Sequence, residues 1–188
     1  SSVDILQKAT RTIGITEDHI SGTVLALSFP FLNTTDTVNA TLSIGNGASI
    51  TAKAGALTIA SDITTKATIS YLGVNAIGGS ITLADNKFKE TIKNKVKLGN
   101  GVTLLAEKGE MTLRAKNNHT GDLKGTNIAA NIASLADHLG TYNTGDITSE
   151  VVIGTDFAAK GQALTLEACN TDVYLYHGKK VSVSRALN

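Results

Sequence analysis

The sequence predicts an all-β fold in which parallel strands stack as a solenoid, and three observations predict it. A phrase of Gly, any residue, aliphatic, Thr and aliphatic recurs at 55–59, 79–83 and 109–113, and a fourth copy at 161–166 carries one inserted residue. The 188 residues include 18 Gly and 25 Thr but only one Pro and 4% aromatics. A longer block, 42–55, also recurs at 96–109. A Gly turn that leads into alternating residues is typical of a strand, and regular repetition of such units is typical of a stacked array.

The 54-residue repeat suggests how the strands stack. Residues 42–55 align without a gap with residues 96–109, and a third block starts at 151 but reaches Gly161 three residues sooner. A repeat of this length divides into three turns of about 18 residues, which suits a rung of three short strands. We therefore expect roughly nine to ten rungs, about 4.8 Å apart. Leu57 and Ile59 should then point inward in ladders, with Thr58, Thr82, Thr112 and Thr165 facing outward.

The individual elements follow in order. Residues 1–37 are the least regular, with weak helical spacing over 2–12, a degenerate strand at 22–27 and a turn near Pro30. They are expected to form irregular first rungs. Apolar and polar residues alternate from Val38 to Ile44, which predicts a strand, and 45–47 read Gly-Asn-Gly, which predicts a turn. Residues 1–188 are interpreted as a single solenoid segment of a larger protein, with repeats over 38–188.

Residues 127–140 leave two alternatives open. Helical spacing of Ile128, Ile132, Leu135 and Leu139, followed by Gly140 as a possible cap, favours a short helix. Leu135-Ala136-Asp137, however, repeats the Leu83-Ala84-Asp85 of a predicted strand about one repeat earlier. The strand is slightly favoured.

The charge pattern argues against a nucleic-acid partner. Lys and Arg number 17 against 16 Asp and Glu, a net charge of +1. The densest basic run, 87–97, holds five Lys against Glu90 and a single aromatic, Phe88, whereas a nucleic-acid footprint would be larger and would normally carry several stacking aromatics. A solvated loop or a strand edge explains it better. No stretch reaches the ~20 apolar residues of a membrane-spanning helix.

No known catalytic, phosphate-binding or metal-binding motif is present, so no catalytic, cofactor-binding or metal-ligating residue is expected. The histidines are isolated in sequence and expected to face solvent: His19, His119, His138 and His177. The single cysteine, Cys169, should behave as a small buried apolar residue. β-Helical polysaccharide enzymes need charged residues clustered on one face, and Asp62, Asp85 and Glu107 could share a face. Surface or corner roles are favoured, because their offsets from the phrase differ.

The phrases at 53–60 and 160–168 resemble the haemagglutinin-type repeats of bacterial large exoproteins. These are the filamentous haemagglutinin-like adhesins of two-partner secretion, which include leukotoxin-like filamentous proteins. The resemblance covers roughly residues 38–185. It implies a right-handed parallel β-helix, secretion through an outer-membrane transporter partner, display at the bacterial surface, and attachment to receptors on host cells or other bacteria, either protein or glycan. The family's secretion-domain motifs are not recognisable, which favours a piece of the repetitive shaft.

The expected function is therefore structural and adhesive rather than enzymatic, and the binding residues are unknown. Two alternatives are a fragment of a leukotoxin-like cytotoxin and a β-helical polysaccharide-active enzyme. Because stacking alone explains the repeated phrase, any site of the segment's own is expected where the phrase fails, at 1–37, 85–95 and 116–150.

Overall fold

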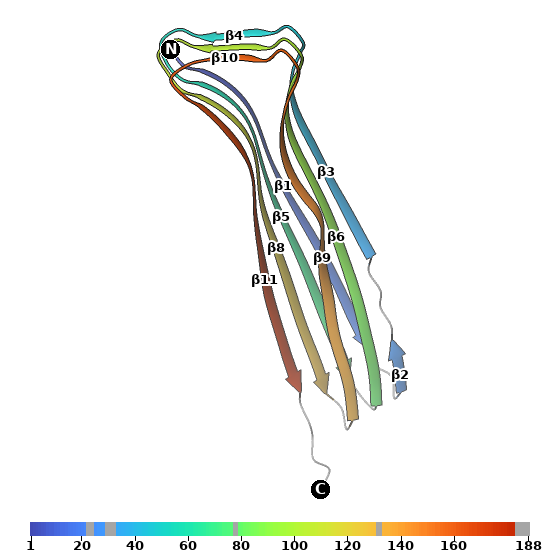
Figure 1. Ribbon diagram of the computed structural model, residues 1–188. Helices are drawn as coiled ribbons and strands as arrows, with labels where there is room; N and C mark the ends of the chain where they lie inside the picture. The colour runs from blue at the N-terminus through green and yellow to red at the C-terminus, as the bar shows by residue number, and fades with distance from the viewer. Residues whose placement is uncertain (22–24, 29–32, 77–78, 131–132, 183–188) are drawn as a thin grey trace.

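The structure is a computed structural model that describes residues 1–21, 25–28, 33–76, 79–130 and 133–182, and every regular element in these ranges is a β-strand. Long strands lie side by side in two sheets, and short strands cross between them at one end (Figure 1). The first long sheet contains β1 (Val3–Ser21), β5 (Leu57–Ala76), β8 (Met111–Ala130) and β11 (Leu164–Ser182). The second long sheet contains β2 (Leu25–Ser28), β3 (Asn33–Ile44), β6 (Gly79–Leu98) and β9 (Ala133–Ile153). The short sheet contains β4 (Ser49–Ala52), β7 (Thr103–Ala106) and β10 (Ala158–Lys160).

All of these strands pair in parallel, which confirms an all-β fold of stacked parallel strands. Leu57 pairs with Val3 on one side and with Met111 on the other, so neighbours along the stack are one full sequence repeat apart. One coil is thus a long strand, a second long strand and a short strand. The first coil is β1–β4, the second β5–β7 and the third β8–β10, and β11 opens a fourth.

The predicted division of each repeat into three short rungs is therefore wrong, and so is the count of nine to ten rungs. The strands that replace the rungs are long, and β9 alone has 21 residues. The reason is visible in the sequence, because the stretches 57–72 and 80–98 contain neither Gly nor Pro. Without a turn residue, the chain continues as one strand and changes direction only three times in each coil.

Apolar ladders fill the interior next to the short sheet. The side chains of Leu57 and Ile59 are fully buried, as predicted, and they align with Met111 and Leu113 of the next coil. The core there also includes Val96, Leu98, Val102 and Leu104. Thr58, Thr112 and Thr165 align on the outward side, also as predicted. Thr82 lies on β6, in the other long sheet, and its side chain is outside the described residues.

The predicted Gly-Asn-Gly corner is confirmed. Gly47 and Gly101 both have φ of +66°, a conformation that favours glycine, and Asp156 takes the same place in the third coil with φ of 56°. Asn46 and Asn100, which precede these two glycines, are neighbours in successive coils. The side-chain oxygen of Asn46 accepts a hydrogen bond from the Asn100 N–H at 2.9 Å, and that of Asn100 accepts one from the Thr155 N–H at 3.1 Å. Each corner is thus hydrogen-bonded to the corner of the coil before it.

Several further expectations change. The phrase copy at 79–83 begins β6 at the far end of the coil, so the phrase does not mark one fixed position. Residues 127–130 and 133–140 are strand, which resolves the alternative left open. Residues 3–21 are not irregular but pair continuously with β5. The predicted turn near Pro30 lies outside the described residues.

Candidate functional site

Away from the short sheet, the interior between the two long sheets becomes mixed, because buried polar side chains lie among apolar ones such as Ile63, Ala67 and Ile92. The buried polar side chains there form what we define as the interior polar layer: Asp36, Ser61, Thr65, Glu90, Asn94, Asn117, His119 and Asp122. Six of the eight lie in the stretches 1–37, 85–95 and 116–150, where the phrase fails. The 54-residue register brings these distant stretches together inside the molecule.

Asn94 joins the two long sheets. Its side-chain amide donates to the backbone oxygens of Ser61, at 2.8 Å, and Lys116, at 3.0 Å, while its oxygen accepts from the Ser61 hydroxyl at 2.6 Å. Asn94 is 1% exposed. In the next coil the Asn117 amide donates to the Thr148 backbone oxygen at 2.9 Å, so a second Asn makes the same kind of bridge. A buried polar network of this kind fixes one register, because every alternative would leave polar groups without partners.

Two ionisable residues, Glu90 and His119, lie together in the interior polar layer, next to the Thr65 hydroxyl. The Thr65 hydroxyl lies 2.7 Å from Nδ1 of His119, and a Glu90 carboxylate oxygen lies 3.4 Å from the same nitrogen. A hydroxyl–imidazole–carboxylate relay needs its two partners on opposite ring nitrogens. Here both partners share Nδ1, and the His119 and Glu90 side chains have no exposed surface. These contacts therefore link neighbouring coils and the two long sheets inside the molecule.

The ladder that contains His119 continues along the stack. Arg11, Thr65, His119 and Asp172 are aligned neighbours on β1, β5, β8 and β11. On the facing sheet, Asp36 aligns with Glu90. Arg11 and Asp36 form an ion pair in the first coil, where the Asp36 side chain is 12% exposed. Charged groups at this level thus oppose each other across the interior.

The outer face of the second long sheet carries a row of lysines along β6. Its outward positions include Lys89, Lys93, Lys95 and Lys97, while Ile92, Asn94 and Val96 between them are buried. Lys95 pairs with Glu150 of β9 at 2.8 Å. The prediction of a loop or a strand edge for this run is wrong, because β6 is a strand that lies between β3 and β9. Alternation puts the charges on the solvent side of a central strand.

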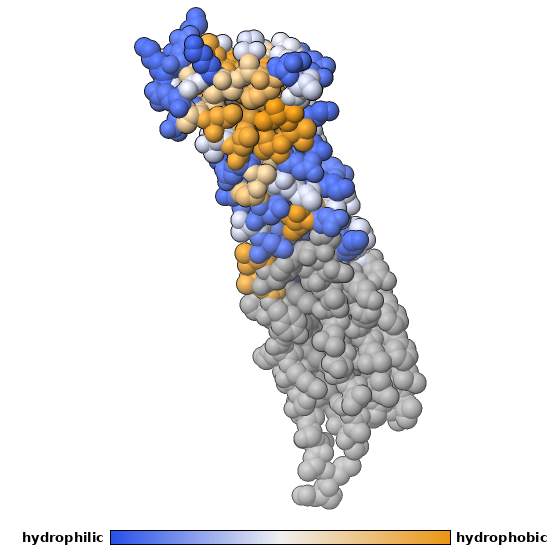
Figure 2. All heavy atoms as spheres, viewed as in Figure 1, coloured by the Kyte–Doolittle hydropathy of each residue, from blue (hydrophilic) through white to orange (hydrophobic). Residues whose placement is uncertain are grey.

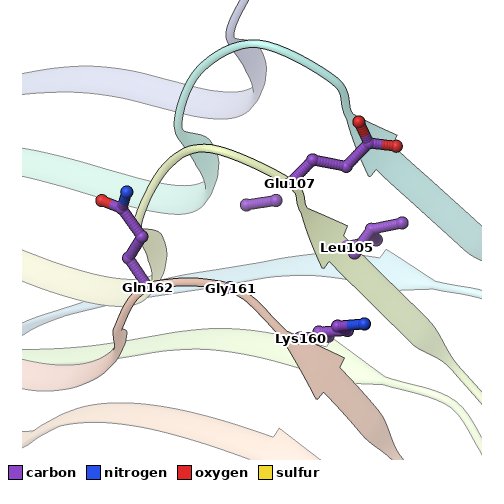
Figure 3. A pocket seen from close by; sticks show the side chains of 6 residues that line it. Leu105, Glu107, Lys160, Gly161 and Gln162 are labelled. Carbon is purple, nitrogen blue, oxygen red and sulfur yellow. The ribbon is translucent and has the colours of Figure 1, made fainter.

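A hollow of about 410 Å³ lies at the corner between the third coil and the start of the fourth (Figure 3). It is lined by Leu105, Ala106, Glu107, Lys160, Gly161 and Gln162. It exists because the corner before β11 is shorter than the one before β8, so the last corner does not cover Glu107 and its neighbours. A carboxylate, an ammonium and an amide surround an apolar floor.

Two other predicted residues have clear surroundings. Asp62 faces outward on β5 and accepts two hydrogen bonds from Arg114, at 3.0 and 2.7 Å, and this hydrogen bonding raises the pKa of Arg114. Asp62 is therefore paired with Arg114, not with Glu107, and the side chain of Asp85 is outside the described residues.

Cys169 is not a buried apolar residue as predicted. Because the corner before β11 is two residues shorter than the corner before β8, the register changes from 55 to 53, and Cys169 aligns with the outward Lys116 on β8. Its thiol lies 3.3 Å from a carboxylate oxygen of Glu167, and partial burial together with that hydrogen bond raises the pKa of the thiol.

The prediction that histidines face solvent is wrong for His119, which is 1% exposed, and the side chains of His19, His138 and His177 are outside the described residues. The signal that could have located His119 is the register itself, which places it beside Thr65 and near Glu90. Among the described side chains, no group of three or more His, Cys, Asp or Glu is placed to hold a metal ion.

The described segments contain no helix with the length and apolarity that a membrane crossing requires. No family model, no curated protein and no solved structure matches this chain.

Proposed function

We propose that this chain is a structural and adhesive β-helical segment of a secreted or surface-displayed bacterial exoprotein. In this proposal it resembles the filamentous haemagglutinin-like adhesins, leaves the cell through an outer-membrane transporter, and attaches to protein or glycan receptors on host cells or other bacteria. The coil is right-handed in the same proposal, since about 98% of parallel strand connections have that sense.

The observation that carries the proposal is the difference between the inward and the outward side chains of the long strands. Inward positions hold the apolar ladders and the interior polar layer, and these side chains are buried in contacts within the stack of coils. Outward positions present regular rows, with threonines on the first long sheet and lysines on the second. A rigid, repetitive outer face is what a shaft needs when it holds a receptor-binding surface away from a cell.

The test is attachment of the purified chain to intact cells. Fluorescently labelled protein is incubated with cultured host cells and with bacteria, and the bound fraction is measured by flow cytometry. We expect saturable binding that unlabelled protein competes away. A triple variant, Lys89→Gln, Lys93→Gln and Lys97→Gln, tests the lysine row as the receptor-binding face and should lower the bound fraction at least about tenfold if each lysine contributes ~0.5 kcal/mol or more.

The matched control is Thr58→Glu, Thr112→Glu and Thr165→Glu, which changes the net charge by the same amount on the opposite sheet. Its binding should exceed that of the lysine variant. Equal losses in both variants would mean that charge alone governs binding. Absence of saturable binding to every cell type would contradict an adhesive role, and lysis of host cells by the chain would favour the cytotoxin alternative.

A further inference from the structure

Two corners of the coil carry an Asn-Gly pair. We call residues 45–48 the first corner, 99–102 the second and 154–157 the third, because they connect a long strand to a short strand in successive coils. Asn46-Gly47 lies in the first corner and Asn100-Gly101 in the second. Both asparagines are exposed, and Figure 2 shows hydrophilic atoms gathered at the ends of the short strands, so water reaches these corners.

An asparagine that is followed by glycine can deamidate without an enzyme, because glycine has no side chain to shield its backbone nitrogen. That nitrogen attacks Cγ of the asparagine, a C–N bond forms, the glycine nitrogen loses its proton and the side-chain nitrogen leaves as ammonia. Water then opens the resulting succinimide ring at one of its two carbonyl carbons. Opening at Cγ leaves aspartate, whereas opening at the backbone carbonyl carbon leaves isoaspartate, whose main chain is one carbon longer.

In the folded chain the second corner holds both reacting groups of the first. The Gly47 N–H donates to the Asn100 backbone oxygen at 2.8 Å, and the Asn46 side-chain oxygen accepts from the Asn100 N–H at 2.9 Å. The attack requires the glycine nitrogen to leave the first bond and the asparagine side chain to turn away from the second. Asn46 therefore reacts when the two corners part, and its rate follows the free energy of that local opening.

The third corner holds the second in the same way. The Gly101 N–H donates to the Thr155 backbone oxygen at 2.8 Å, and the Asn100 side-chain oxygen accepts from the Thr155 N–H at 3.1 Å. The third corner has Thr155-Asp156 where the other two have Asn-Gly. The residue that holds Asn100 in place thus has no side-chain amide to lose.

These contacts make the two sites unequal. Residue 100 makes both hydrogen bonds that hold Gly47 and the Asn46 side chain, whereas Thr155 makes those that hold Gly101 and the Asn100 side chain. Isoaspartate at position 100 displaces the carbonyl group that accepts from Gly47, so Asn46 is no longer held. Isoaspartate at position 46 leaves the two bonds from the second corner to Thr155 in place.

We propose that Asn46 and Asn100 are deamidation sites whose rates are set by the contact between successive corners, and that conversion of Asn100 releases Asn46 but not the reverse. Deamidation then marks the corners that have parted, and isoaspartate keeps a marked corner from closing in its original register. The proposal does not rest on the adhesive function, since it concerns only the contacts between coils.

The first test compares the folded chain with the same chain in urea. Both samples are incubated in mildly alkaline buffer, and the two corners are followed separately by peptide mass spectrometry. In urea the two sites should react at similar rates, because both read Gly-Asn-Gly. In the folded chain each should react about tenfold more slowly or less, because the corners must first part.

The second test opens one corner at a time. An added Cβ at Gly154 would lie 2.6 Å from the Asn100 side-chain oxygen, and one at Gly99 would lie 2.7 Å from the Asn46 backbone nitrogen. Gly154→Ala should therefore raise the rate at Asn100 about tenfold or more, with Asn46 following after a lag. Gly99→Ala should raise the rate at Asn46 by a similar factor and leave Asn100 at its wild-type rate.

Two control variants separate local opening from lost stability. Gly45→Ala makes the same substitution where nothing lies within 4 Å of the added Cβ, and both sites should keep their wild-type rates. Asn94→Ala removes hydrogen bonds between the long sheets, about 17 Å along β6 from Gly99. It should lower the urea midpoint without changing either rate in the folded chain.

A double variant tests the order of the two reactions. Asn100→Ser combined with Gly154→Ala cannot deamidate at position 100, but it keeps the backbone N–H and oxygen that hold the first corner. Asn46 should then stay at its slow wild-type rate, without the lagged reaction that Gly154→Ala shows alone. Rapid reaction of Asn46 in this double variant would show that the order is not set by residue 100.

Three other results would overturn the proposal. One is equal deamidation rates in the folded chain and in urea. Another is a Gly99→Ala variant that accelerates Asn100 as much as Asn46. The last is an Asn94→Ala variant that accelerates both corners as much as the glycine variants do, because the rates would then follow global unfolding instead of the contact between corners.

Discussion

A methyl group added at Gly99 should destabilise the chain, whereas the same change at Gly45 should not. The two glycines occupy the same corner in successive coils, and each is followed by Asn and Gly. Only Gly99 lies on another coil. Its added Cβ would lie 2.4 Å from the Asn46 side-chain oxygen and 2.7 Å from the Asn46 backbone nitrogen.

The magnitude follows from these contacts. Backbone cannot move aside as a flexible side chain can, and overpacking of this kind costs ~1–3 kcal/mol. Displacing the Asn46 oxygen also loses its hydrogen bond from the Asn100 N–H, worth ~1 kcal/mol. At Gly45 the same substitution adds no contact and stiffens the unfolded chain, which contributes about 0.4–1 kcal/mol of stability. The two variants should therefore differ by roughly 2–5 kcal/mol.

Urea unfolding followed by far-UV circular dichroism measures the difference. With slopes of ~1–3 kcal/mol/M, the midpoint of Gly99→Ala should fall below that of Gly45→Ala by about 1 M or more. Equal midpoints would refute the reasoning, since they would mean that the corners of successive coils are not in contact.

Three further predictions concern single side chains. Asn94→Ala should lower the free energy of unfolding by about 3 kcal/mol, because three buried hydrogen bonds are lost at ~1 kcal/mol each, and Asn94→Asp should not restore it, because it lacks the amide donor. His119→Leu should cost ~1–3 kcal/mol, because it removes the hydrogen-bond partner of the buried Thr65 hydroxyl and a neighbour of the buried Glu90 carboxylate, and a double-mutant cycle with Glu90→Leu should show a smaller cost for the pair than for the sum. Because partial burial raises the pKa of Cys169, alkylation by iodoacetamide should reach half its maximal rate at a higher pH in the folded chain than in urea. The stability linked to this thiol is fully present below its unfolded pKa and is lost as the pH rises through its folded pKa, so the urea midpoint of the wild type should fall over that interval relative to Cys169→Ser.

The fold class was predictable because its signals are local. Alternation fixed which residues of 38–44 and 57–59 face inward, and glycine predicted the corner at 45–47. The 54-residue length of one coil was not predicted, although it equals the offset between the aligned blocks 42–55 and 96–109. Dividing the repeat by three assumed short strands, whereas the absence of turn residues over 57–72 shows that the strand continues.

The interior polar layer was only partly predictable. The failure of the phrase at 85–95 and 116–150 indicated where the layer lies. That His119 is buried depends on Glu90, on the facing sheet, and Thr65, one coil earlier, so single-residue statistics predict an exposed histidine. Cys169 was misplaced because the prediction rested on residue type, whereas alternation from Leu166, which aligns with the buried Leu113, puts Cys169 on the outward side of β11.

The 54-residue coil also has a kinetic consequence. Neighbouring strands of the described sheets cannot meet until about 54 residues of chain have been brought into place, and closing a loop of that length costs roughly 3.5 kcal/mol of chain entropy before any contact forms. Against a chain of 188 residues, this separation gives a relative contact order near 0.29, from 54/188, above the ~0.16–0.22 of ordinary slow-folding β-proteins. The first pairing of two coils should therefore limit the folding rate, and once it exists each later coil adds to a template that is already formed.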